Sequence, residues 1–281
     1  MPPGTMPGQQ MPQRQPIPGV KYLVAVASGK GGVGKTTVAV NLSLALAKLG
    51  NKVGLLDADV YGPNVPIMLG STGEPMATPQ QRIIPVQSQG IKMISMGLLN
   101  PGDKPVIWRG PMLHGVITQF LRSVEWGELD YLVIDLPPGT GDVQLTLIQT
   151  VEVTGAVVVT TPSTVALADV RKAIEMFRQV NVEVLGVVEN MSTFSCPHCG
   201  KDIDIFGHGE GAKTASEYGV PLLGEIEIDP RIRLGGDTGN PVAAQGESAP
   251  AAQSLYRVAK AVVARLVEVA ATSSGPSVQI D

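Results

Sequence analysis

The chain has 281 residues, of which 43% are hydrophobic and 16% are charged, and its formal net charge is -4. This balance predicts a substantial buried core and excludes a protein that binds nucleic acid nonspecifically through a basic surface. No apolar run approaches the roughly 18 residues of a membrane-spanning helix, the N-terminus lacks the apolar core of a signal peptide, and two cysteines are too few for a disulfide framework, so we expect a cytoplasmic protein without nucleic-acid or membrane partners.

The N-terminal segment, residues 1–19, is rich in Pro, Gly, Gln and Met, and Arg14 is its one charged residue. Such a segment cannot bury enough apolar surface to offset the entropy lost on ordering, so we predict a flexible tail. One domain is expected over residues 20–270, followed by a second flexible tail over 271–281.

The first expected element is a buried parallel strand over residues 22–27, which ends at a glycine-rich loop. The loop, GKGGVGKT from Gly29 to Thr36, fits the G-x-x-x-x-G-K-[ST] pattern, and a helical pattern follows it up to Gly50. In a P-loop of this kind the backbone amides surround nucleotide phosphates, the lysine contacts the β- and γ-phosphates, and the Thr36 hydroxyl ligands Mg²⁺. The loop residues expected to bind the nucleotide are Gly29, Lys30, Gly31, Gly32, Val33, Gly34, Lys35, Thr36 and Thr37.

Two further strands end in aspartates. The run 52–56 is followed by Asp57 and Asp59, and the run 131–134 is followed by Asp135. A carboxylate that follows an apolar strand beside a P-loop lies near Mg²⁺, so we assign Asp135 the Walker B role, acting through a metal-bound water. Asp57 is expected to support its loop. The Pro- and Gly-rich loop after Asp135 is suited to sensing the γ-phosphate.

The remaining elements alternate between strands and helices. Residues 71–105 predict loops and a small hairpin, with short apolar runs inside them. Further strands are expected at 156–160, 184–188 and 222–225, and helices at 112–124, 142–151, 166–180 and 253–269. This alternation predicts an α/β fold with a doubly wound, mostly parallel sheet and helices on both faces. The last helix has few cations, which favours a packing helix over a membrane-targeting one.

The two cysteines, Cys196 and Cys199, form a single C-x-x-C pair. We interpret the segment around them, about 192–211, as an insertion in the domain. A redox pair, half of a zinc site and half of an iron–sulfur site with four thiolates all fit this spacing. His198 and His208 are candidates to complete a zinc site.

Lys30 adds a second lysine to the P-loop. In this respect KGGVGKT resembles the deviant Walker A family, in which the extra lysine reaches the nucleotide bound by the partner subunit. The resemblance implies a homodimer that encloses ATP, with Lys30 and Lys35 both catalytic. A symmetric dimer with the cysteine pairs on its axis brings four thiolates together, which fits a bridging [4Fe–4S] cluster and leaves zinc open.

Seven motifs then occur in one order: GKGGVGKTT, DADVYGPN, VIWRGPM, DLPPGTGD, NMS, CPHC and IFGHGEG. With them the chain resembles the Mrp/ApbC family, P-loop ATPases that carry iron–sulfur clusters to apoproteins, over about Val20 to Gln245. The resemblance implies Asp59 as the switch I aspartate that orients or activates the attacking water, and Asn190 as a residue that contacts adenine. Many relatives carry an extra N-terminal domain, and the Pro- and Gly-rich tail takes its place here.

Three functions compete at this point. A cluster carrier would use ATP, Mg²⁺ and a [4Fe–4S] cluster, hydrolyse ATP slowly, and deliver the cluster to apo iron–sulfur clients. A positioning ATPase of the partitioning or cell-division type would share the lysines and aspartates but would not need the cysteines, and it would use a basic surface that this sequence lacks. A zinc-bridged dimer would use the cysteines, with ATP regulating assembly. We expect the cluster carrier.

Overall fold

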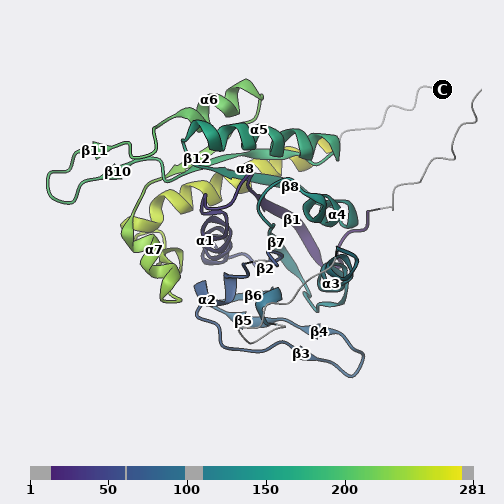
Figure 1. The fold of residues 1–281 in the computed structure, drawn as a ribbon. Helices are drawn as coiled ribbons and strands as arrows, with labels where there is room; N and C mark the ends of the chain where they lie inside the picture. Colours follow the sequence, from purple (N-terminus) through teal and green to yellow (C-terminus); the bar gives the residue numbers. More distant parts are fainter. Residues whose placement is uncertain (1–13, 61, 99–109, 274–281) are drawn as a thin grey trace, which may run out of the picture.

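The computed structural model describes residues 14–60, 62–98 and 110–273, which fold around an eight-stranded sheet (Figure 1). The strand order is β12-β9-β8-β1-β7-β2-β6-β5. Neighbouring strands are parallel throughout, except that β5 runs antiparallel to β6. The predicted doubly wound, mostly parallel sheet is therefore confirmed.

The elements follow the predicted alternation along the chain. The sheet strands are β1 (Val20–Ala27), β2 (Val53–Asp57), β5 (Val86–Ser88), β6 (Ile91–Ser95), β7 (Leu129–Asp135), β8 (Gly155–Thr160), β9 (Val184–Asn190) and β12 (Leu222–Ile226). The helices are α1 (Lys35–Lys48), α2 (Val65–Met68), α3 (Gly110–Ser123), α4 (Asp142–Thr150), α5 (Thr164–Gln179), α6 (Glu210–Glu217), α7 (Pro230–Asp237) and α8 (Gln253–Ser273). Two small antiparallel pairs lie outside this sheet: β3 (Met76–Ala77) with β4 (Ile83–Ile84), and β10 (Phe194–Ser195) with β11 (Asp202–Ile203).

Helices cover both faces of the sheet (Figure 1). In β1, Val24 and Val26 pack into the core shared with α1 and α8, whereas Leu23 and Ala25 pack into the opposite core with α3, α4 and α5. This alternation explains why the strand reads as a continuous apolar run, since a parallel strand buried on both faces needs apolar residues at every position.

The structure corrects the expectation for residues 71–105. The run at 91–96, assigned to a small hairpin among loops, forms β6, which lies in the main sheet parallel to β2 and forms a hairpin with β5. A short apolar run fits a loop, an edge hairpin or a buried strand equally well. Here the run forms a buried strand because it pairs with β2. Residues 99–105 and most of the VIWRGPM motif lie outside the described residues.

The ends of the domain extend past the expected limits. Ile17 is buried, Gln15 bridges Val151, and the Arg14 guanidinium donates a hydrogen bond to the Val180 carbonyl. Helix α8 continues to Ser273, three residues beyond the expected boundary at 270. The rest of the two predicted tails, residues 1–13 and 274–281, lies outside the described residues.

In the described part of the chain, no helix combines the length and apolarity that crossing a bilayer requires.

The topology places the predicted site residues at one edge of the sheet. The P-loop follows β1, Asp57 ends β2, Asp135 ends β7 and Asn190 ends β9. These strands are parallel, so their carboxyl ends meet at the same edge, where open α/β sheets bind ligands.

Candidate functional site

The P-loop connects β1 directly to α1 and leaves the start of that helix open. Gly34, the residue before α1, has a left-handed backbone with φ 81°. No side chain caps the helix and its first turn contains no acidic residue, so its free amide groups are available to an anion. The loop also packs closely: a Cβ atom on Gly29 would lie 2.3 Å from the backbone of Asp169. Glycine is therefore required where the loop meets α5.

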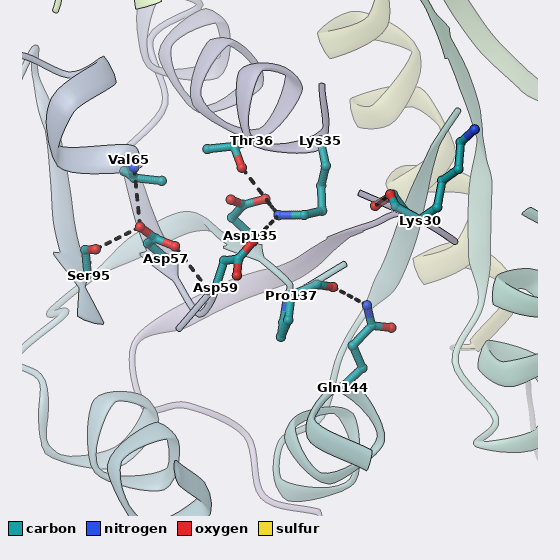
Figure 2. Close-up of polar contacts among 11 residues, drawn as sticks. Lys30, Lys35, Thr36, Asp57, Asp59, Val65, Ser95, Asp135, Pro137 and Gln144 are labelled. Carbon is teal, nitrogen blue, oxygen red and sulfur yellow. Dashed lines mark hydrogen bonds and ion pairs between the residues drawn. The ribbon is translucent and has the colours of Figure 1, made fainter. Parts of the chain in front are cut away.

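Lys35 lies at the centre of a buried charge cluster (Figure 2). Its Nζ atom is 2.6 Å from Asp135 Oδ1 and 3.7 Å from Asp59 Oδ2, and 3.4 Å from the Thr36 hydroxyl. The side chain is only 6% exposed, so the ion pairs form largely away from water. In this arrangement the ammonium group of Lys35 is paired with the two carboxylates. In a P-loop with bound nucleotide the same group contacts phosphate oxygens. Any anion that enters the loop competes with Asp135 for Lys35.

Asp135 is the better placed of the aspartates to receive a metal-bound water. Its Oδ2 atom is buried and has no hydrogen-bond partner among the described residues, whereas Oδ1 is paired with Lys35. Burial raises the pKa of Asp135, and the charge of Lys35 opposes this rise. A buried acceptor without a donor is costly unless a ligand supplies one. Asp135 and the Thr36 hydroxyl together thus fit the hydrated Mg²⁺ of a bound nucleotide.

Asp57 supports the backbone that carries Asp59. The Ser95 hydroxyl donates to Asp57 Oδ2 at 2.7 Å, and the amides of Asp59 and Val65 donate at 3.1 and 3.3 Å (Figure 2). Burial, assisted by the negative charge of Asp135, raises the pKa of Asp57 to about 8. This carboxyl therefore loses its proton at a higher pH than an ordinary aspartate does. It holds the Asp59 loop between β2 and α2, in line with the supporting role expected for it.

The loop after Asp135 is fixed at both sides. The Gly139 amide donates to the Ser28 carbonyl at 3.0 Å, which joins this loop to the P-loop. The Gln144 amide on α4 donates to the Pro137 carbonyl, and Gln144 Oε1 is buried without a partner among the described residues. Sequence reasoning missed Gln144, because a glutamine in the first turns of a helix has no recognisable pattern.

Lys30 differs from Lys35 in its direction. Figure 2 shows its side chain directed away from Lys35, Asp135 and Asp59. Its own carbonyl accepts a hydrogen bond from Ser28, and within the described residues its ammonium group forms no ion pair. The carboxylates of residues 14–60, 62–98 and 110–273 therefore form no ion pair with this second cation of the P-loop.

A cavity of about 590 Å³ adjoins the P-loop. It lies between the start of α1, the end of β9 and helix α7, and its wall includes Thr37, Asn190, Ile232 and Arg233. The Asn190 amide donates to the Val33 carbonyl at 2.9 Å, so this residue joins the cavity to the P-loop. The α7 side of the wall was not expected, because the α7 helix had no predicted counterpart.

The two cysteines lie at the tip of the β10–β11 hairpin, which projects from the domain (Figure 1). The Cys196 amide donates to the Lys201 carbonyl, and the Gly200 amide donates to the Cys196 carbonyl, each at 2.9 Å. The backbone amides of His198 and Cys199 lower the pKa of Cys196, because they stabilise its thiolate. Both thiols are free, and Cys199 is exposed. The turn therefore favours a thiolate that can bind a metal.

No complete metal site of one chain forms around these thiols within the described residues. The group of three or more metal-ligating side chains found there contains Glu189, His208 and Glu225, and neither cysteine belongs to it. His208 lies at the base of the insertion, where its Nδ1 atom is 3.2 Å from the Thr193 hydroxyl. The zinc alternative in which His208 joins the two cysteines is not assembled in this structure.

The chain is similar to known proteins over most of its length. Over residues 19–263 the chain matches the ParA family model described as the NUBPL iron-transfer P-loop NTPase. A protein of Aquifex aeolicus named iron-sulfur cluster carrier protein is 55% identical, over 92% of this chain and 72% of that protein. A Dictyostelium discoideum protein named iron-sulfur cluster transfer protein NUBPL is 47% identical, over 92% of this chain and 81% of that protein.

Solved structures show the same fold. A nucleotide-binding protein of Archaeoglobus fulgidus, solved with ADP and described as containing cobalt, is 43% identical with a TM-score of 0.70, covering 79% of this chain and 87% of its own. The cell division ATPase MinD of Pyrococcus furiosus is 24% identical with a TM-score of 0.65, covering 86% of this chain and 98% of its own. The likeness to MinD concerns the fold alone.

Proposed function

Since the chain belongs to the ParA-type family of NUBPL iron-transfer P-loop NTPases, we propose that it hydrolyses ATP and carries a [4Fe–4S] cluster to client apoproteins. The observation that carries this proposal is the cysteine hairpin. It presents the chain's two thiols at an exposed tip, in a turn that favours the Cys196 thiolate, with no third ligand from the same chain within the described residues. A four-iron cluster needs four thiolates, so two hairpins hold one cluster.

The names of the relatives support this cargo. Proteins named iron-sulfur cluster carrier or transfer protein are about half identical to this chain over most of its length. The positioning ATPase is the weaker candidate, because a solved structure of that type, MinD of Pyrococcus furiosus, is only 24% identical and its likeness extends to the fold alone.

ATP binding replaces ion pairs that the free protein already forms. The γ-phosphate takes Lys35 away from Asp135, and the Asp135 carboxylate and the Thr36 hydroxyl would then hold a hydrated Mg²⁺ ion beside the phosphates. The Mg²⁺ ion supplies positive charge to the phosphates and the leaving group. Asp59, held by Asp57, then orients the attacking water, and Asn190 contacts adenine in the adjoining cavity.

Lys30 completes the site of the partner subunit. Its side chain is directed away from its own Asp135 and is half-buried without an ion pair among the described residues, so it is available to a second molecule. In a two-fold dimer each Lys30 would reach the phosphates bound by the other chain and stabilise the charge that develops in the transition state. Slow turnover in the absence of a client follows if the dimer closes rarely.

Coupling between ATP and cluster runs through β9. Asn190, the last residue of this strand, contacts the P-loop carbonyl of Val33, and the insertion with the cysteines begins at the next residues. A shift of the P-loop during hydrolysis therefore moves the root of the hairpin. Cluster release in this scheme depends on how the two hairpins separate.

Elemental analysis of protein purified without oxygen tests the proposal. About four iron and four sulfide ions per dimer are expected, with an iron–sulfur absorption band. Zinc at about one ion per dimer, with no sulfide, would overturn the cluster and favour the zinc-bridged dimer. The cobalt described for the Archaeoglobus protein makes this comparison of metals necessary.

A further inference from the structure

A second group of metal-ligating side chains lies at the root of the cysteine hairpin, away from the thiols. Glu189 and Glu225 are the second-to-last residues of the neighbouring strands β9 and β12, and His208 lies on the segment that returns from the hairpin to α6. The ligand atoms of these three residues all lie within 4.8 Å of one another. Ligands around a tetrahedral ion with bonds of about 2.1 Å lie about 3.4 Å apart, so a small rotation of the exposed imidazole closes the site.

The sheet register forces the two carboxylates together. Glu225 and Glu189 are direct partners in the parallel β12–β9 ladder, so their side chains leave the same face of the sheet. Glu189 is fully buried, and Glu225 is half-buried. Like charges directly opposite one another on neighbouring strands are destabilising. A cation between them removes this repulsion.

The described part of the chain does not supply that cation from a lysine or arginine. The ion pairs found there include neither Glu189 nor Glu225. Glu189 accepts hydrogen bonds from the amides of Gly209 at 3.2 Å and Gly211 at 2.5 Å, one on each oxygen. A carboxylate oxygen has two lone pairs, and only one on each oxygen is used here. Both oxygens of Glu189 therefore keep a lone pair for an ion.

The histidine is oriented as metal-bound histidines are. The Thr193 hydroxyl lies 3.2 Å from His208 Nδ1, which leaves Nε2 as the nitrogen available to a cation. Metal-binding histidines commonly have their second nitrogen fixed by such a contact. Thr193 lies on the segment that leads from β9 to the cysteines, and His208 lies on the segment that returns. An ion here would therefore join both stems of the insertion to the sheet.

We propose that Glu189, Glu225 and His208 bind one divalent first-row transition-metal ion, such as Zn²⁺ or Fe²⁺, at a site separate from the cysteines. One imidazole and two carboxylates suit an ion of this class, and water completes its coordination. The ion fixes the root of the cysteine hairpin one residue away from Asn190, which contacts the P-loop. This site holds its ion whether or not the thiols hold a cluster.

The test uses the full chain with Cys196→Ser and Cys199→Ser, so that the thiols cannot bind the probe. Zn²⁺ titrated into this metal-free protein without nucleotide should bind at about one ion per chain, raise the Tm, and slow hydrogen exchange at residues 193–211. Adding His208→Asn or Glu225→Gln should weaken Zn²⁺ binding at least about tenfold each. The matched controls are His198→Asn and Glu227→Gln, exposed neighbours that should leave affinity unchanged.

A charge reversal separates the metal site from a role in folding alone. Glu225→Lys should abolish Zn²⁺ binding yet raise the Tm of the metal-free protein, because the lysine supplies the missing cation beside Glu189. Absence of Zn²⁺ binding in the double-serine protein, or affinity that neither His208→Asn nor Glu225→Gln changes, would overturn the proposal. A lower Tm for Glu225→Lys would overturn the charge argument on which it depends.

Discussion

The nucleotide site and the cysteine hairpin differ in how much of each one chain supplies. At the carboxyl edge of the sheet, Lys35 on α1 already contacts Asp59, which follows β2, and Asp135, which ends β7. At the hairpin tip, two thiols lie on one short turn, held by backbone hydrogen bonds of that turn. A parallel sheet brings residues that are distant in the sequence to one edge. The hairpin of the two-residue strands β10 and β11 offers only the side chains of its own turn. In the proposed function, the hairpin therefore depends on a second molecule more than the P-loop does.

The largest effect is expected from Lys35→Ala, which removes the cation shared by the whole nucleotide site. ATP turnover should fall by at least about 10³-fold and ATP affinity should fall with it, because the β- and γ-phosphates lose their direct positive partner. Steady-state hydrolysis and nucleotide titration measure the two effects. Iron content should stay near that of the unchanged protein, because Lys35 does not contact the hairpin that carries the cysteines.

The control for this variant is Lys48→Ala, which removes an exposed lysine from the last turn of the same helix. Circular dichroism checks folding, because Lys35→Ala also leaves Asp135 and Asp59 without their buried cation. Near-normal ATP turnover by folded Lys35→Ala would contradict the assignment of the phosphate site.

The sharpest test of the comparison is Lys30→Ala, because Lys30 is the part of the P-loop assigned to the partner chain. Turnover should fall by about 10²–10³-fold while ATP affinity changes little, since the lysine acts on the transition state of the other subunit. Mixing Lys30→Ala with Lys35→Ala protein should then restore about a quarter of normal activity, because half of the dimers contain one intact composite site. If the mixture stays inactive, Lys30 acts within its own chain.

The third prediction concerns the hairpin. Cys196→Ser should reduce iron from about four atoms per dimer to a small residue, because two of the four thiolates are lost from each cluster. ATP turnover measured without clients should change less than about twofold, because neither thiol contacts Lys35, Asp59 or Asp135. Ser195→Ala, one residue earlier in the same hairpin, is the matched control. A stable cluster at full stoichiometry in Cys196→Ser would exclude the bridging arrangement.

The same contrast explains what the sequence could predict. The P-loop, the two strand-ending aspartates and the C-x-x-C pair have fixed spacings, and the parallel alternation places the first three at one sheet edge. The pairing of β6 with β2 was missed because a five-residue apolar run does not reveal its partner. Gln144, the α7 wall of the cavity and the register that pairs Glu189 with Glu225 were also missed, since each depends on contacts between distant segments.

The smallest effect is expected at Asp57, which supports the site without contacting the nucleotide. The pKa of its carboxyl rises from 3.8 to about 8 on folding. At a pH between these two values, the native protein therefore keeps a proton that the unfolded chain has already released. The native state binds more protons in this window, and the free energy of unfolding therefore falls as pH rises from about 4 to about 8. Asp57→Asn removes this group from the titration, so Tm should depend less steeply on pH between about 5 and about 8.

Asp204→Asn, at an exposed carboxylate of the insertion, should keep the original slope. Part of the slope should persist in Asp57→Asn, because burial also raises the pKa of Asp135. An unchanged slope would mean that Asp57 is ionised in the native protein and that its loop depends on a buried charge.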